Sequence, residues 1–181
     1  MPLIGDWRHA IATLLMLGAL SAPAGAQSSS EPAVKAGFVY NFAKFTEWPA
    51  GAIAGPQISV CLVGADPLGA VSALLDARPL QGRTIVVRRQ VRGDDIKTCS
   101  IVFITDVDER RQTEALRAVQ GLPVLTIGDA EGFADAGGMI GLVAADNRIQ
   151  FEVNLDPAQR AGLKIHSQLL KLARAVKGRT P

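Results

Sequence analysis

Apolar and polar residues alternate with two different periodicities along the chain, which predict helices in some segments and strands in others. The first helical segment covers residues 33–48. Its aromatic and aliphatic residues recur at spacings of four, four and three and share one face: Val34, Phe38, Phe42 and Phe45. Because a residue that precedes proline is disfavoured in the helical conformation, Pro49 predicts that this helix ends at Trp48.

The middle of the chain predicts strands that alternate with helices. Short apolar runs at residues 58–63, 84–88, 100–105 and 123–127 are typical of buried strands. A helix with Asp66 as its N-cap is predicted after the first strand, with an apolar face of Leu68, Val71, Leu74 and Leu75. A second helix is predicted over residues 108–120, and a short helix or turn over residues 130–136.

The last third of the chain predicts a hairpin followed by a long helix. Residues 139–143 and 148–154 flank Asp146-Asn147, a plausible tight turn, and therefore predict two antiparallel strands. A final helix is predicted from Asp156 to about Val176. The alternation of strands and helices predicts an α/β fold, a three-layer sandwich with a mostly parallel sheet and an antiparallel edge hairpin.

Composition limits the class of protein. The chain has 181 residues, with 19 Lys or Arg, 17 Asp or Glu and 48% hydrophobic residues. This balance is that of a folded protein with no strong affinity for nucleic acid. We expect one folded domain from a chain of this length.

The first 26 residues have the layout of a secretory signal peptide. An apolar run over residues 10–20 is followed by Ala24-Gly25-Ala26, which fits a cleavage site before Gln27. The run is short for a membrane span, although an uncleaved membrane anchor is the alternative. The predicted division is a signal peptide at 1–26, a flexible leader at 27–32 and a single α/β domain at 33–181, outside the cytoplasm.

The two cysteines, Cys61 and Cys99, predict a disulfide. An even pair in an oxidising compartment is typical of one. Cys61 lies in the first predicted strand and Cys99 at the start of the third, and these strands are neighbours in a doubly wound sheet. The alternative is a pair of buried free thiols.

Candidate catalytic chemistry is sparse. After signal removal the chain retains one histidine, His166, and it has no G-x-S-x-G motif, so we predict no catalytic residue, no metal site and no cofactor. Asp66, Asp106 and Asp129 follow predicted strands, where ligands often bind. We favour capping and turn roles for them, with a small-molecule crevice at these aspartates as the alternative function.

A partner-binding surface is predicted near the end of the chain. On residues 148–154, alternate residues face outward, and this strand is a candidate sheet edge that offers unpaired backbone groups. Basic residues recur at near-helical spacing on the predicted final helix and suit an acidic partner. The predicted contacts are Glu152, Asn154, Arg160, Lys164 and Lys171. The alternative is a solvated face on which Glu152 pairs with Arg160.

Three segments, residues 34–49, 137–143 and 148–173, together resemble the YfiR family of periplasmic proteins. The resemblance implies a non-enzymatic, homodimeric regulator that binds and represses the periplasmic sensor region of an inner-membrane diguanylate cyclase. It also implies that an outer-membrane lipoprotein of the YfiB type can titrate the regulator away, which raises cyclic-di-GMP and biofilm formation. The named YfiR type carries a second cysteine pair near residues 137–143, which this chain lacks.

Overall fold

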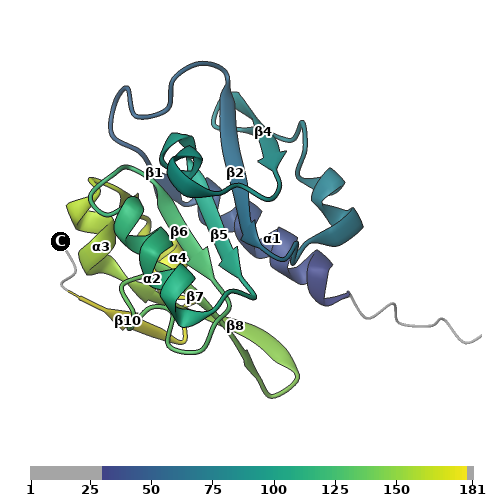
Figure 1. The fold of residues 1–181 in the computed structure, drawn as a ribbon, viewed down its shortest axis with the longest axis vertical. Coiled ribbons are helices and arrows are strands. Elements are labelled where there is room, and N and C mark those ends of the chain that lie inside the picture. Colours follow the sequence, from purple (N-terminus) through teal and green to yellow (C-terminus); the bar gives the residue numbers. More distant parts are fainter. Residues whose placement is uncertain (1–29, 179–181) are drawn as a thin grey trace, which may run out of the picture.

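The computed structural model describes residues 30–178, which form an eight-stranded sheet, a two-stranded sheet and six helical segments (Figure 1). The strands are β1 (Thr46–Glu47), β2 (Gln57–Gly64), β3 (Pro79–Leu80), β4 (Arg83–Arg88), β5 (Ile101–Thr105), β6 (Leu125–Gly128), β7 (Ile140–Ala145), β8 (Arg148–Asn154), β9 (Lys164–Ile165) and β10 (Ala175–Lys177). The α-helices are α1 (Glu31–Lys44), α2 (Glu109–Ala118), α3 (Leu155–Arg160) and α4 (Ser167–Leu170), and the 3₁₀ helices are η1 (Gly69–Leu74) and η2 (Gly93–Thr98). The predicted signal peptide, residues 1–26, lies outside the described residues.

The large sheet is mostly parallel. Its strand order is β10-β8-β7-β6-β5-β2-β4-β3, and the pairs β3–β4 and β7–β8 are antiparallel. If the two-residue strand β3 is left aside, the parallel part has the order 2-1-3-4-5 that is typical of doubly wound α/β folds. The predicted α/β class is therefore confirmed.

Helices cover both faces of the sheet because its central strands are apolar on both faces. In β5, Ile101 and Phe103 belong to one buried cluster, while Val102 and Ile104 belong to the other. The first cluster includes α1, η1 and α3, and the second includes α2 and η2. Figure 1 shows α2 in front of the sheet and α1 behind it. These are the three layers that the sequence predicts.

Helix α1 packs on the sheet through aromatic rings, as predicted. Phe42 is fully buried, with its ring centroid 5.5 Å from that of Phe38 and 5.0 Å from that of Phe151 on β8. The helix begins at Glu31, inside the predicted leader, because a proline in the first turn suits a helix start. It ends earlier than predicted, and Thr46–Glu47 form β1.

The long final helix is wrong as a prediction. Helix α3 ends at Arg160, and the chain continues through β9, α4 and β10. The cause is a Schellman turn: Gly162 has φ +71°, its N–H donates to the Gln159 carbonyl, and the Leu163 N–H donates to the Ala158 carbonyl. Glycine adopts this positive φ without strain, so the helix stops there.

The apolar face predicted for the segment after β2 is also only partly correct. The segment forms the 3₁₀ helix η1, and Leu74 is 60% exposed. The predicted cap is present, since Asp66 Oδ1 accepts hydrogen bonds of 2.9 Å from the backbone N–H groups of Leu68 and Gly69.

The β7–β8 hairpin forms as predicted, but β8 is not the edge of the sheet. Asp146 and Asn147 both have positive φ, 51° and 57°, which is the geometry of a tight two-residue hairpin turn. Strand β10 pairs with β8 in parallel, with Ala175 opposite Glu152 and Lys177 opposite Asn154. The edge strand on this side of the sheet is therefore β10, which sequence periodicity assigned to a helix.

Candidate interaction surface

Glu152 and Asn154 lie on the face of β8 that is turned away from α1. Glu152 is 19% exposed at its side chain, with a carboxylate oxygen 4.0 Å from Arg174 Nε and another 3.7 Å from Lys177 Nζ. Asn154 Nδ2 donates to the Ala134 carbonyl (2.8 Å), and its Oδ1 accepts from the Asp156 N–H (3.1 Å). The alternative pairing of Glu152 with Arg160 is replaced by pairing with the basic residues at β10.

Lys177 connects β10 to the loop after β6. Its ammonium contacts Asp135 as well as Glu152. The hydrogen bond to Asp135 is the main cause that raises the pKa of Lys177, and partial desolvation opposes it. The strand that closes the sheet is thus joined by charge to both β8 and this loop.

The three predicted basic contacts belong to different elements. Arg160 ends α3, Lys164 lies in β9 opposite Glu47 of β1, and Lys171 follows α4, all with exposed side chains. The helix that would have aligned them does not form, so their spacing in sequence does not produce one stripe. Glu152 pairs with Arg174 and Lys177, Asn154 bonds to the backbone of Ala134 and Asp156, and the three basic residues lie on separate elements.

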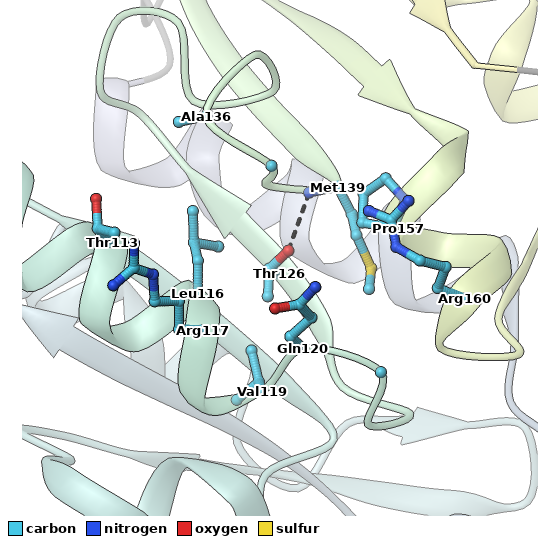
Figure 2. Close-up of a pocket in the computed structure, with 12 residues that line it drawn as sticks. Thr113, Leu116, Arg117, Val119, Gln120, Thr126, Ala136, Met139, Pro157 and Arg160 are labelled. Carbon is cyan, nitrogen blue, oxygen red and sulfur yellow. Dashed lines mark hydrogen bonds between the residues drawn. The ribbon is translucent and has the colours of Figure 1, made fainter.

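A pocket of about 270 Å³ lies between α2 and α3 (Figure 2). Helix α2 and its C-terminal turn supply one wall, the loop before β7 supplies another, and α3 supplies the third. The lining residues are Thr113, Leu116, Arg117, Val119, Gln120, Gly121, Thr126, Ala136, Gly137, Met139, Pro157 and Arg160. One predicted partner contact, Arg160, is therefore also a pocket residue.

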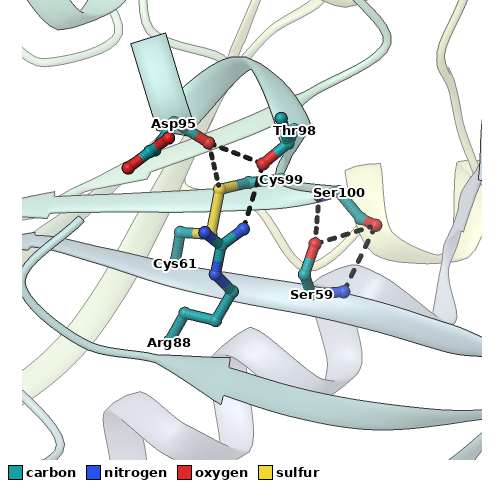
Figure 3. Close-up of a disulfide and its surroundings, with 7 residues drawn as sticks. All are labelled: Ser59, Cys61, Arg88, Asp95, Thr98, Cys99 and Ser100. Atoms are coloured by element: carbon teal, nitrogen blue, oxygen red, sulfur yellow. Dashed lines mark hydrogen bonds between the residues drawn. A yellow bond between two sulfur atoms is a disulfide. The ribbon is translucent and has the colours of Figure 1, made fainter. Parts of the chain in front are cut away.

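The predicted disulfide between Cys61 and Cys99 is present, with an S–S distance of 2.02 Å and Cα atoms 6.1 Å apart (Figure 3). It joins β2 to Cys99, which lies two residues before the start of β5. Two serines reinforce the same pair of strands, because the Ser100 N–H donates to Ser59 Oγ (2.9 Å) and the Ser59 N–H donates to Ser100 Oγ (3.3 Å). The bridge has a structural role in the sheet, because nucleophilic cysteines usually lie in exposed settings and these two do not.

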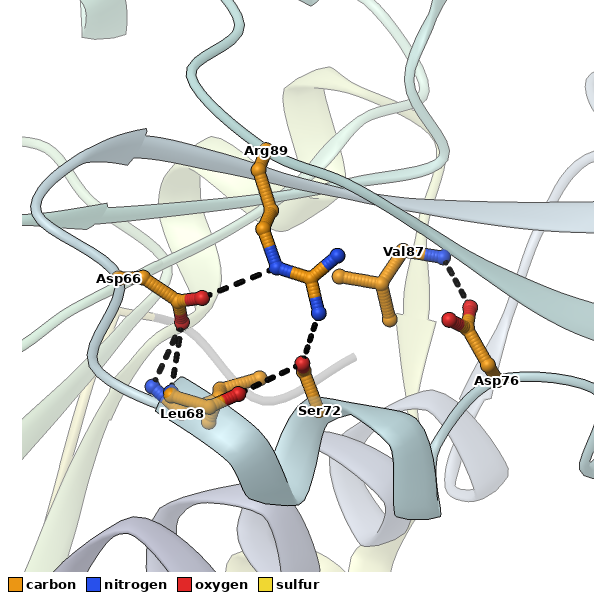
Figure 4. Close-up of polar contacts among 7 residues, drawn as sticks. Asp66, Leu68, Ser72, Asp76, Val87 and Arg89 are labelled. Carbon is orange, nitrogen blue, oxygen red and sulfur yellow. Dashed lines mark hydrogen bonds and ion pairs between the residues drawn. The ribbon is translucent and has the colours of Figure 1, made fainter.

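The three aspartates after the strands do not share a site. Asp66 binds Arg89 Nε at 3.0 Å while it caps η1, and the same guanidinium contacts Ser72 (Figure 4). Asp106 occupies a turn with φ +47°. Within residues 30–178, no group of three or more His, Cys, Asp or Glu side chains is placed to hold a metal ion. These contacts agree with capping and turn roles for Asp66 and Asp106.

Asp129 has a role that sequence reasoning missed. Its Oδ2 accepts hydrogen bonds from Lys35 Nζ (2.8 Å) and Thr105 Oγ1 (2.9 Å), and Lys35 Nζ also lies 2.8 Å from Glu31. Burial acts to lower the pKa of the Lys35 ammonium, but the hydrogen bonds to Asp129 and Glu31 and the negative charges of these carboxylates together outweigh it and raise the pKa. Asp129 thus attaches the start of α1 to the carboxyl ends of β5 and β6, in place of a capping role.

The fold and these contacts define an α/β domain with one internal disulfide. A charged surface lies at the side of the sheet where β10 covers β8. The sequence model of the YfiR/HmsC-like family matches residues 32–174, and the chain therefore belongs to that family, which consists of periplasmic regulatory proteins. In the described part of the chain, every helix is too short or too polar to cross a bilayer.

Two solved structures are similar to parts of this chain at low sequence identity. One is the ABC domain in complex with L-Trp from Streptococcus pneumonia, at 12% identity and a TM-score of 0.46, aligned over 66% of this chain and 54% of that one. Another is a conserved domain protein from Vibrio cholerae, at 13% identity and a TM-score of 0.44, aligned over 67% of this chain and 55% of that one. The chain thus spans about half the length of each.

Proposed function

We propose that this protein is a non-enzymatic periplasmic repressor that binds the periplasmic sensor region of an inner-membrane diguanylate cyclase. Repression would lower cyclic-di-GMP and biofilm formation, and an outer-membrane lipoprotein of the YfiB type would relieve it by binding the repressor. The observation that carries this proposal is the family match over residues 32–174. Export by a cleaved signal peptide and assembly as a homodimer belong to the same proposal.

The way the chain uses its polar residues supports a binding role over a catalytic one. Asp66 and Asp129 lie where ligands of doubly wound folds usually bind, but the carboxylates of both bind groups within the chain. An enzyme of this architecture would keep such groups available to its substrate.

The surface that we assign to the partner is built around β8 and β10, with Glu152 and Asn154 at its centre and Arg160, Lys164 and Lys171 at its margin. Edge strand β10 offers a side with no partner strand among the described residues. Val176 (40% exposed) lies within this strand, and Leu172 (72% exposed) lies three residues before it. Unpaired backbone next to exposed apolar side chains is typical of a surface that another protein covers.

A charge reversal at Glu152 tests this surface. Glu152→Lys should weaken capture of the cyclase's periplasmic region by roughly thirtyfold, which corresponds to the loss of about 2 kcal/mol at a central contact. Binding is measured by titration with the purified sensor region. Because Glu152 also pairs with Arg174 and Lys177, the isosteric variant Glu152→Gln is included, since it removes the charge with less repulsion.

The matched control is Glu131→Lys, the same charge change at an exposed residue outside the assigned surface. It should bind the partner like the parent protein. Circular dichroism and melting curves establish that each variant is folded. A folded Glu152→Lys protein with parental affinity would remove Glu152 from the surface, and no binding by the parent protein would reject the cyclase as its partner.

A further inference from the structure

The pocket between α2 and α3 has a charge composition unlike that of the surrounding surface. Its only ionisable lining residues are Arg117 and Arg160, and it contains no carboxylate. Both guanidinium groups lack an ion-pair or hydrogen-bond partner among residues 30–178. By contrast Arg110, about two turns earlier on α2, pairs with Glu114. Two unpaired cations at one pocket create a local positive potential that attracts an anion.

Neutral donors add to these cations. The Gln120 amide has no partner in the described part of the chain, and Figure 2 shows Gln120 and Thr126 between Arg117 on one side and Arg160 on the other. Thr126 is 2% exposed, and its Oγ1 accepts the Met139 N–H at 2.9 Å. A hydroxyl group carries one donor as well as its acceptor lone pairs, and the Thr126 donor has no acceptor within residues 30–178.

The inner wall of the pocket is apolar. Val119 and Met139 are buried there, and Leu116 and Pro157 complete the wall. A volume of about 270 Å³ is near the lower limit of small-molecule sites, which favours a compact ligand. Arginine binds planar anions such as carboxylates through two parallel hydrogen bonds.

We propose that this pocket binds a small carboxylic acid with a short apolar body. The carboxylate lies between Arg117 and Arg160, within reach of Gln120, and the body contacts Val119 and Met139. This inference goes beyond the proposed function and does not depend on the identity of the protein partner. It also differs from the small-molecule site that the sequence offered at Asp66, Asp106 and Asp129, three residues that follow strands and do not share a site.

Isothermal titration of the purified protein, without any partner, tests the proposal. The probes are butyrate and succinate, with butyramide as the uncharged match of butyrate and inorganic phosphate as a second anion. At least one acid should bind saturably and more tightly than phosphate, and butyramide should not bind. Arg117→Gln and Arg160→Gln should each weaken acid binding by roughly tenfold or more, because each removes a charge-assisted hydrogen bond.

Arg110→Gln is the matched control on the same helix and should bind the acid like the parent protein. Three results would overturn the proposal: no saturable binding of either acid, equal binding of butyrate and butyramide, or parental affinity in both pocket variants. Tighter binding of phosphate than of both acids would overturn the assignment to carboxylates. Since no partner is present, failure here is distinguishable from failure of the proposed repressor function.

Discussion

The ring of Phe133 occupies a space that exists because Gly128 and Gly138 have no side chains. A Cβ atom at either glycine would lie closer than 3.0 Å to the ring. Phe133 is itself buried on the α2 side of the sheet, in the same cluster as the disulfide. Glycine at these two positions therefore serves packing, and their backbone φ values are not in the positive region.

We predict that Gly138→Ala lowers the free energy of unfolding by about 1–3 kcal/mol, the usual cost of overpacking a core. Gly37→Ala is the control, because a Cβ there meets nothing within 4 Å and the residue lies inside α1. Alanine is the better helix former by up to about 1 kcal/mol, so this control should be neutral or stabilising. Chemical denaturation measures both, and equal stability of the two variants would contradict the packing argument.

Lys35 gives the molecule a pH-dependent contact. Its pKa is raised in the folded protein, so its contribution to stability is complete below the unfolded value of about 10.4 and is lost as pH rises through the higher folded value. Lys35→Met should cost about 1–2 kcal/mol near pH 8, since it removes a hydrogen-bonded cation from Asp129.

Urea denaturation of the parent and of Lys35→Met at pH 8 and pH 11 tests this contact. The difference in unfolding free energy between the two proteins should shrink at the higher pH, because the other titrating groups are common to both. A difference that stays constant between the two pH values would show that the Lys35 charge does not contribute.

At the scale of elements, α1 depends on its fit against β8. The ring of Phe42 contacts both Phe38 on its own helix and Phe151 on the strand, and all three belong to or pack on one core. Sequence periodicity identified this aromatic face correctly. The helix also buries Ala36, Val39 and Ala43, whose small side chains allow it to approach the sheet.

Phe42→Ala should lower the free energy of unfolding by about 3–5 kcal/mol, because it removes a fully buried ring. Phe38→Ala is the comparison on the same helix face and should cost less, because Phe38 is only partly buried. Thermal melts at two protein concentrations give the measurement. If Phe42→Ala melts like the parent protein, the ring is not part of the core; a concentration-dependent melt would instead assign this face to a dimer.

For the whole molecule, the C-terminal segment determines where the sheet ends. After α3 the chain forms β9 against β1, then α4, and returns to cover β8 with β10. The return is held by the Arg174 N–H, which donates to the Phe151 carbonyl at 2.8 Å, and by the pairing of Lys177 with Glu152 and Asp135. Without β10, the outer side of β8 would present unpaired backbone groups.

A chain that ends at Ala173 should therefore self-associate. Size-exclusion chromatography should show larger species that grow with concentration, because an open strand edge is a template for pairing with another chain. The control ends at Gly178 and retains β10. Identical elution of the two truncated proteins at every concentration would show that β10 does not protect the edge.

Local features of the sequence were sufficient for much of this protein. Apolar runs located the central strands, Asp66 identified a helix cap, and Asp146-Asn147 identified the hairpin turn. The cysteine pair was predictable because strand order follows from the doubly wound pattern. The similarity to the YfiR family was likewise recognisable from short segments of the sequence, and the family match over residues 32–174 confirmed it.

Only the tertiary structure decided the contacts between residues that are distant in sequence. The basic residues after Arg160 fit a helical period, but Gly162 ends the helix. Residues 175–177 instead form a strand that pairs with β8. Lys35 and Asp129 are 94 positions apart, and nothing in the local pattern joins them. Arg117 and Arg160 share a pocket for the same reason: the fold of the sheet brings α2 and α3 together, and periodicity within a segment carries no information about its neighbours in space.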